Sequence, residues 1–193
     1  MARVSLPLRT ERLLLRPFTD DDLDVLLDIQ SREEVTRYLY WGPRSREEVA
    51  EMLERIKKMM SFDAEGHGIR LAAVLPESGV LVGDISLRLV SREHQQGEIG
   101  FVVHPDHQGH GYATEGAAAL VELGFRQLGL HRIVGSADAR NIGSVRVMER
   151  LGMCREAFFA ENELVKGEWT SEVIYAILGS EWEARTLPQW PSR

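Results

Sequence analysis

The stretch from His104 to Thr114 (HPDHQGHGYAT) constrains this chain most, because it joins a strand-like run directly to a long helix-like run. Gly109 and Gly111 remove two Cβ atoms, so that backbone N–H groups can converge on an anion. The amino end of the following helix adds partial positive charge. This geometry suits a pyrophosphate without a lysine. The glycines alone are equally compatible with a plain tight turn.

Two common nucleotide-binding motifs do not fit this stretch. The chain has no G-x-x-x-x-G-K-[ST] sequence, which excludes a P-loop. The spacing of Gly109, Gly111 and Gly116 also differs from the G-x-G-x-x-G dinucleotide fingerprint. A phosphate-binding loop here therefore belongs to another class of protein.

The 193 residues fit a single domain, 1–193, with one substantial core. The formal net charge of -7 argues against nucleic-acid binding and only mildly favours a cationic substrate. Met1–Thr10 lacks the apolar run of a signal peptide, and no stretch approaches the roughly 20 apolar residues of a membrane span. Cys154 is the single cysteine, so no internal disulfide forms. We expect a cytoplasmic protein with no membrane association.

Hydrophobic periodicity predicts mixed α/β structure. Before the loop we expect one strand, two helices capped by Thr19 and by a Ser45/Glu48 capping box, and a three-strand antiparallel meander. The corresponding strand ranges are Arg12–Phe18, Ile69–Leu75, Val80–Val90 and Glu98–Val103. After the loop we expect a helix over Tyr112–Leu128, a parallel strand over His131–Ala139, a helix from Asn141, and strands near Cys154–Ala160 and Trp169–Leu178.

Gln108–Ala113 (QGHGYA) matches the Q/R-x-x-G-x-G/A signature of the GNAT acetyltransferases. Over about residues 8–183 the chain resembles the RimJ/RimL type, the ribosomal-protein N-terminal acetyltransferases. The other matching pieces are Thr10–Phe18 (TERLLLRPF), Gly83–Ile85, Glu98–Val103 (EIGFVV), Gly111–Glu115, Asn141 with Ser144, Leu151–Met153, Gly167–Trp169, Tyr175 and Trp182. The resemblance implies an α/β (α+β) GNAT fold: a mixed, mostly antiparallel sheet with a central parallel splayed strand pair flanked by helices.

In that family acetyl-CoA lies between two splayed parallel strands, which match Glu98–Val103 and His131–Ala139 here. The resemblance implies that the pantetheine arm is bound by the backbone of Phe101, Val102 and Val103 and by Asn141, which can also serve as a helix N-cap. It assigns the pyrophosphate to Gln108, Gly109, His110, Gly111, Tyr112, Ala113 and Thr114. Gly100 is either a β-bulge that opens the splay or a packing glycine.

Acetyl transfer to an amine requires that the ammonium lose a proton before attack. The resemblance makes Glu98 the leading base, with a rim carboxylate as the alternative, and Glu163 a second candidate beside the acceptor. Ser144 is placed to protonate the leaving thiolate, or is a surface serine. Tyr38, Tyr40, Trp41 and Trp169 flank turn-like segments. Core packing explains any single one of them, but one or two, with Tyr38 and Trp41 the candidates, are expected to line the acceptor site. Ser171 stands where the family often has an acid. This difference argues against the chain binding its acceptor in the same way as those relatives.

His104, His107 and His110 invite interpretation as metal ligands, but the intervening proline and glycines disfavour converging ligands, and we expect no metal. Cys154 is expected to be buried and inert. Three functions stay open. They are an N-acetyltransferase of a protein N-terminus or small amine, an aminoglycoside- or polyamine-type resistance enzyme, and a non-catalytic acyl-CoA sensor. Relatives commonly form homodimers, so a homodimer is possible.

Overall fold

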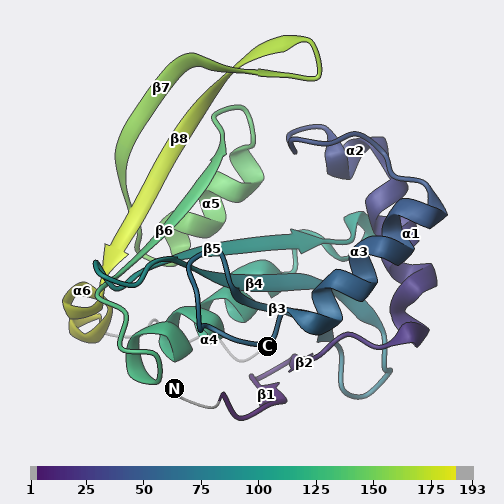
Figure 1. The fold of residues 1–193 in the computed structure, drawn as a ribbon, viewed down its shortest axis with the longest axis horizontal. Helices are drawn as coiled ribbons and strands as arrows, with labels where there is room; N and C mark the ends of the chain where they lie inside the picture. Colours follow the sequence, from purple (N-terminus) through teal and green to yellow (C-terminus); the bar gives the residue numbers. More distant parts are fainter. Residues whose placement is uncertain (1–3, 186–193) are drawn as a thin grey trace.

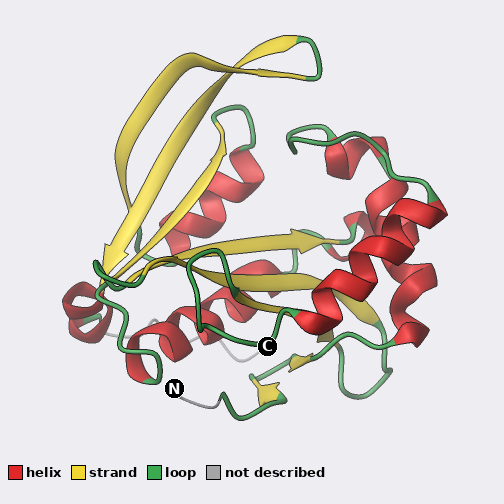
Figure 2. Cartoon of the chain, viewed as in Figure 1, coloured by secondary structure: helices red, strands yellow, loops and turns green. Residues whose placement is uncertain are grey.

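In the computed structural model, residues 4–185 are described, and their strands form one eight-stranded sheet in the order β1-β2-β3-β4-β5-β6-β8-β7 (Figures 1 and 2). All neighbouring strands are antiparallel except β5 and β6, which are parallel. The strands are β1 (Leu8–Arg9), β2 (Leu14–Arg16), β3 (Gly68–Val74), β4 (Leu81–Ser91), β5 (Gln96–Val103), β6 (Arg132–Asp138), β7 (Cys154–Val165) and β8 (Glu168–Leu178).

Helices cover both faces of this sheet. The α-helices are α1 (Leu23–Ser31), α2 (Glu33–Thr36), α3 (Arg46–Lys58), α4 (Tyr112–Arg126), α5 (Ile142–Arg150) and α6 (Gly179–Ala184). Two short 3-10 helices are also present. η1 (Asp20–Asp22) precedes α1, and η2 (Pro105–His107) precedes residues 108–111, called the glycine turn below, which lead into α4. The mixed α/β architecture with a parallel pair is the fold class that the sequence indicated.

Alternation along the strands sorts the core into two layers. On one face, α4 and α5 pack on residues such as Ile85, Leu87 and Ile133. On the other face, α1 and α3 pack on Ala72 and Val74. Successive strand residues point to opposite faces, so even-numbered residues of β3 face the α1–α3 layer.

The predicted capping box of α3 is present. Glu48 N donates to Ser45 Oγ at 3.3 Å, and Ser45 N donates to Glu48 Oε2 at 2.8 Å. The helix then buries its apolar stripe, and the residues of that stripe are Val49, Met52, Leu53 and Ile56. This stripe fixes α3 on the sheet face that will form the floor of the cleft described below.

Several elements differ from the sequence prediction. α2 and α6 were not expected, and β7 continues to Val165 instead of ending at residue 160. Cys154, expected to be buried, is exposed, because it opens an edge strand that has a partner on one side only. Gly100 is not a bulge, since its register with Ser86 is regular and the shift in this strand pair lies between Leu89 and Ser91.

Candidate active site

β5 and β6 run together briefly and then part. They are in register at Gln96–Arg132, Gly97–Ile133 and Glu98–Val134 only. Beyond that point β5 stays paired with β4, and β6 stays paired with β8. Figure 1 shows the divergence, with β6 turning toward the β7–β8 hairpin while β5 continues toward α3. The predicted splayed pair is therefore present.

The hydrogen bonds between β4 and β5 determine which backbone groups of β5 face the gap between β5 and β6. His104 N donates to Val82 O at 2.8 Å, one step beyond the Gly83–Val103 pair. Because antiparallel pairs alternate, Val102 directs its N–H and C=O toward β4, whereas Phe101 and Val103 direct theirs into the gap. The backbone groups of Phe101, Val102 and Val103 were all expected to bind the ligand, but those of Val102 are hydrogen-bonded within the sheet.

The glycine turn follows β5 and leads into α4. Gly109 has φ +79° and Gly111 has φ +83°, and Gly111 is the N-cap of the helix. Both values lie in the left-handed region that residues with a Cβ avoid. Gln108 folds back on the strand, where its Nε2 donates to Val103 O at 3.1 Å. The two glycines therefore set the path of the turn at the start of α4.

Glu115, in the first turn of α4, ties this turn to the amino-terminal segment. Its carboxylate accepts hydrogen bonds from Thr10 Oγ1 at 2.6 Å, from Arg12 N at 2.7 Å and from Arg12 Nε at 2.7 Å. Arg12 also donates to the carbonyl of His110 at 3.0 Å, and the His110 ring stacks on Tyr112. Thr10–Phe18 and Gly111–Glu115 both match the family pattern in the sequence, and the structure brings these two segments into contact.

Thr114, in the first turn of α4, has a buried side-chain hydroxyl without a hydrogen-bond partner among the described residues. The residue is 5% exposed. A buried hydroxyl normally finds a partner, because an unmade hydrogen bond costs about 1–3 kcal/mol. Its place in the first turn of α4 fits a site completed by a ligand.

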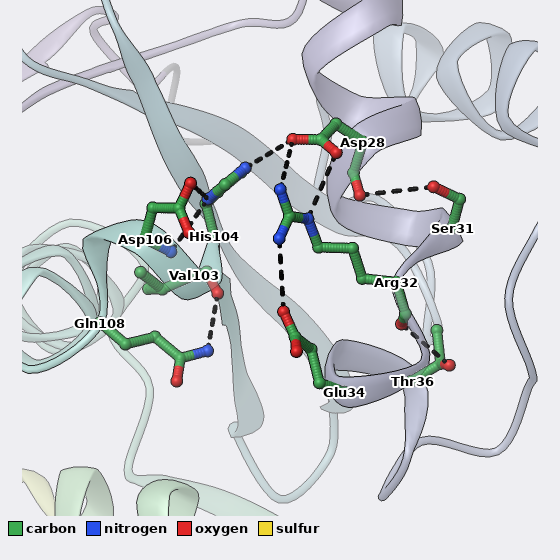
Figure 3. Close-up of polar contacts among 9 residues, drawn as sticks. All are labelled: Asp28, Ser31, Arg32, Glu34, Thr36, Val103, His104, Asp106 and Gln108. Atoms are coloured by element: carbon green, nitrogen blue, oxygen red, sulfur yellow. Dashed lines mark hydrogen bonds and ion pairs between the residues drawn. The ribbon is translucent and has the colours of Figure 1, made fainter.

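His104 anchors the start of the turn to α1, as Figure 3 shows. Its Nδ1 accepts a hydrogen bond from Asp106 N at 3.1 Å, so its Nε2 carries the proton and donates to Asp28 Oδ2 at 2.7 Å. Arg32 donates to both oxygens of Asp28, at 3.2 and 3.1 Å. Hydrogen bonds from Arg32 and then from His104 lower the pKa of Asp28. His104 thus has a positioning role, and among residues 4–185 no group of His, Cys, Asp or Glu side chains is arranged to hold a metal.

A cleft of about 1320 Å³ lies on the α1–α3 face and reaches across the splay to the β7–β8 hairpin. It brings together the predicted site residues Tyr38, Trp41, Glu98, Phe101, Val102, Asn141, Ser144 and Glu163. Val103 and Gln108–Thr114 do not line it. The glycine turn therefore does not share the cleft that holds the acceptor candidates.

Asn141 and Ser144 stand at the amino end of α5, beside β6. Asn141 caps this helix, because its Oδ1 accepts from Ser144 N at 3.1 Å. Trp41 Nε1 donates to Gln30 Oε1 at 3.2 Å, which fixes the indole at the rim. The exposed Trp169 does not line the cleft, so it is not a wall of the acceptor site.

The hairpin side of the cleft is acidic. Glu163 and Glu172 come from the hairpin, and Glu98 comes from β5, where it is ion-paired with Arg88. Burial, and then Glu163, raises the pKa of the Tyr40 hydroxyl. Glu172 lines the same wall, and burial together with the charges of Glu163 and Glu98 raises the pKa of its carboxyl. Sequence reasoning missed Glu172, although a glutamate directly before the apolar run VIYAIL was a visible signal.

Lys166 links the β7–β8 hairpin to the other side of the cleft. It lies between β7 and β8, and its Nζ donates to Thr36 O at 2.7 Å and to Arg37 O at 3.0 Å, at the carboxyl end of α2. The hairpin and α2 are therefore joined across the cleft. Among the described helices, none is long and apolar enough to cross a membrane.

Comparison with known proteins agrees with this geometry. The family model described as "Acetyltransferase (GNAT) domain" matches residues 12–154. A Bacillus subtilis protein named as an uncharacterized N-acetyltransferase (YnaD) is 35% identical over 173 residues, which cover 90% of this chain and 97% of that protein. A putative ribosomal N-acetyltransferase of Bacillus subtilis (YdaF) is 28% identical over 88% of this chain and 91% of its own.

A solved structure is similar as well. The crystal structure of a GNAT-family acetyltransferase from Bacillus anthracis has a TM-score of 0.79 and 32% identity, and it covers 90% of this chain and 98% of that one. The splay, the glycine turn and the family match all point to one conclusion. The chain belongs to the GNAT family of acetyltransferases, enzymes that take an acetyl group from acetyl-CoA.

Proposed function

We propose that this protein transfers the acetyl group of acetyl-CoA to a primary amine that lies in the cleft, in a ternary complex. The observation that carries the proposal is the parting of β5 and β6 directly between the glycine turn and the acidic cleft. A donor threaded through the gap would have its phosphates at the turn and its acyl end at the cleft. Acetyl-CoA supplies the activated acyl group, and the chain supplies binding, orientation and proton transfer.

The residues present fit this donor. The N–H and C=O of Phe101 and the N–H of Val103 face the gap and can pair with the amide groups of a pantetheine arm, while Val103 O accepts from Gln108. The N–H groups of residues 109–114, at the amino end of α4, can hold the pyrophosphate. Thr114 Oγ1 is the buried polar atom that such a ligand would satisfy. His110 and Tyr112, stacked on each other, and Ala113 form the rest of the proposed cradle.

The acidic wall handles the acceptor amine. Glu98, Glu163 and Glu172 can attract an ammonium group and take up its proton, directly or through water. Glu98 is already engaged by Arg88, whereas burial disfavours the charged form of Glu172 and raises its pKa. We assign proton removal to Glu98 or Glu172, and orientation of the ammonium to Glu163.

Ser144 lies across the gap from Glu98. Its place in the first turn of α5, held by the Asn141 cap, puts a hydroxyl on the cleft wall next to the splay. We assign it proton donation to the leaving thiolate of coenzyme A. Tyr38 and Trp41 then form the aromatic rim of the acceptor site.

A RimJ/RimL-type role on a protein N-terminus is supported by the motif pattern and by the ribosomal relative, and it stays part of the proposal. A polyamine or aminoglycoside acceptor is favoured by the acids of the hairpin wall.

A homodimer is also proposed. Phe158, Phe159 and Leu164 are exposed on the edge strand β7, where a second copy could pack, and sedimentation equilibrium measures the mass directly.

The test is release of free thiol from acetyl-CoA in the presence of amines, peptides with free N-termini, polyamines and aminoglycosides. We expect turnover of at least one class, and a loss of at least tenfold in kcat for Glu98→Gln or Glu172→Gln and for Ser144→Ala. Titration with coenzyme A measures donor binding separately. Tight coenzyme binding without turnover of any acceptor would favour the sensor function, and absence of binding would refute the donor site.

A further inference from the structure

The end of the cleft opposite the acidic wall is rich in arginine. Arg44, Arg55 and Arg70, from the segment before α3, α3 itself and β3, line this end, whereas Arg88 lies beside Glu98 on the adjacent strand. Arg88 is paired with Glu98, and Arg70 donates to both oxygens of Asp84, at 2.7 and 2.8 Å. Arg44 and Arg55 form no ion pair with any carboxylate among residues 4–185. This end of the cleft therefore carries excess positive charge.

Arg44 is the least compensated of these groups. Its guanidinium donates to the thioether of Met52, which Arg70 Nη1 also approaches at 3.9 Å, and it lies 4.5 Å from the centroid of the Trp41 ring. Burial, and then the charges of Arg70 and Arg55, lowers the pKa of Arg44. The nearby Glu48 raises it, but Glu48 Oε2 is used by the backbone N–H of Ser45. A thioether is a weak acceptor, so most of the hydrogen-bonding capacity of Arg44 is unused by strong acceptors.

The arginines share a continuous floor with the splay. Arg70 is in register with Ser86, and Ser86 with Gly100, on adjacent strands. Strands lie about 4.8 Å apart, so about 10 Å of backbone separates Arg70 from Gly100. Gly100 has no side chain to fill this floor, and a Cβ there would lie 2.7 Å from Ser86 Oγ. A small molecule can therefore extend from the splay to the arginines.

The phosphates of the donor do not explain these arginines. The glycine turn leads into α4, which packs on the face of Ile85 and Leu87. Met52 belongs to the opposite layer, with α1 and α3. Arg44 and Arg70, which both contact Met52, therefore lie on the acceptor side of the sheet.

We propose that the acceptor carries a carboxylate in addition to its amine, and that Arg44, with Arg55, binds this carboxylate at the floor of the cleft. This inference rests on the proposed function and narrows its substrate class to amino-acid-like amines. The acidic wall then receives the ammonium and the arginine end receives the carboxylate. A guanidinium matches a carboxylate with two parallel hydrogen bonds, which makes this the natural occupant.

The first arm of the test compares amines that differ only in the carboxylate. Amino acids, their carboxamides and the corresponding simple amines or diamines are assayed by thiol release, with kcat/KM expressed per unprotonated amine. We expect the carboxylate form to be favoured about 10- to 100-fold, the range for one hydrogen bond to a charged group. Arg44→Gln should remove this preference by lowering kcat/KM for the carboxylate form at least tenfold more than kcat/KM for the carboxamide.

Arg46→Gln is the matched control, because Arg46 is an exposed arginine two residues away that pairs with Asp24 and does not line the cleft. It should leave both substrates unchanged. The second arm needs no turnover. The N-acetylated amino acid is titrated into each variant by calorimetry in the presence of coenzyme A, and circular dichroism checks that each variant is folded. Arg44→Gln should weaken this binding at least tenfold, and Arg46→Gln should not.

The outcomes separate the two proposals. Turnover of carboxamides or diamines as good as that of amino acids would overturn the carboxylate site and leave the acetyltransferase proposal standing. Product binding that depends on Arg44, without turnover of any amine, would support the carboxylate site and refute the proposed reaction. Equal loss of both substrates in Arg44→Gln would show that Arg44 only supports the fold around Trp41, and would also overturn the inference.

Discussion

Replacing Gly109 with alanine isolates what the glycine turn contributes. Gly109 has φ +79°, and a Cβ added there would meet no atom within 4 Å. The substitution therefore introduces no clash, and its cost is the left-handed conformation of the backbone alone. That cost is about 1–2 kcal/mol for a residue with a Cβ.

Gly129 provides a matched control. It has φ +65°, also has open space around its Cβ position, and lies beyond the other end of α4. Gly129→Ala should lower the free energy of unfolding by the same 1–2 kcal/mol or so, measured by urea denaturation. Its distance from the splay means that coenzyme binding should be unaffected.

The two variants should differ in their affinity for coenzyme A. In Gly109→Ala the strained backbone can relax by turning φ negative at this position, which moves the N–H groups that are proposed to hold the pyrophosphate. Loss of one hydrogen bond to a charged group costs about 1.5–3 kcal/mol, which is roughly a 10- to 100-fold rise in Kd. Calorimetric titration of coenzyme A measures it. Equal Kd values for the wild type and both variants would refute the assignment of this turn to the phosphates.

Four further predictions concern other parts of the site. Because burial and Glu163 raise the pKa of Glu172, this carboxyl ionises at a higher pH than an ordinary glutamate. If it is the base, kcat/KM should rise with pH through that raised pKa, and Glu172→Gln should flatten this limb of the pH profile. Ser144→Ala should lower kcat about tenfold or more with acetyl-CoA and much less with an acyl donor that has a more acidic thiol leaving group, followed by stopped-flow absorbance. His104→Ala removes the link from α1 to the turn, so KM for acetyl-CoA should rise several-fold with little change in KM for the amine, in steady-state kinetics. Since Cys154 is exposed at the sheet edge, its alkylation by iodoacetamide, confirmed by mass spectrometry, should leave thiol release unchanged.

The structure of the proposed donor side was predictable because its signals are local in sequence. The turn, the α4 cap and the strand before it lie within residues 96–115, and their geometry follows from glycine and helix-end chemistry. The splay could be expected only from the family resemblance. Periodicity indicates that strands exist, but it does not say where two parallel strands stop pairing.

The acceptor side was less predictable because it depends on register between distant segments. Glu172 faces the cleft because β8 pairs with β6, with Glu172 opposite Asp138. The polar run after residue 160 hid the second half of β7, since an exposed edge strand needs few apolar residues. α2 is a single turn of four residues, too short to show a period.

The pairing of β5 with β4 and of β6 with β8 explains why the gap between β5 and β6 stays open and which donors can bind in it. β5 is held by β4 along its whole length, and β6 is held by β8 at seven successive residues from Arg132 to Asp138. Closing the gap would require one of these ladders to break. Val103 O already accepts from Gln108, so the N–H and C=O of Phe101 and the N–H of Val103 are the groups that an amide-bearing chain would pair with at strand spacing. An arm without amides would leave these groups unpaired. Donor selectivity should thus arise from the backbone of β5, where side-chain substitutions at Phe101 would alter affinity far less than the loss of one amide from the ligand.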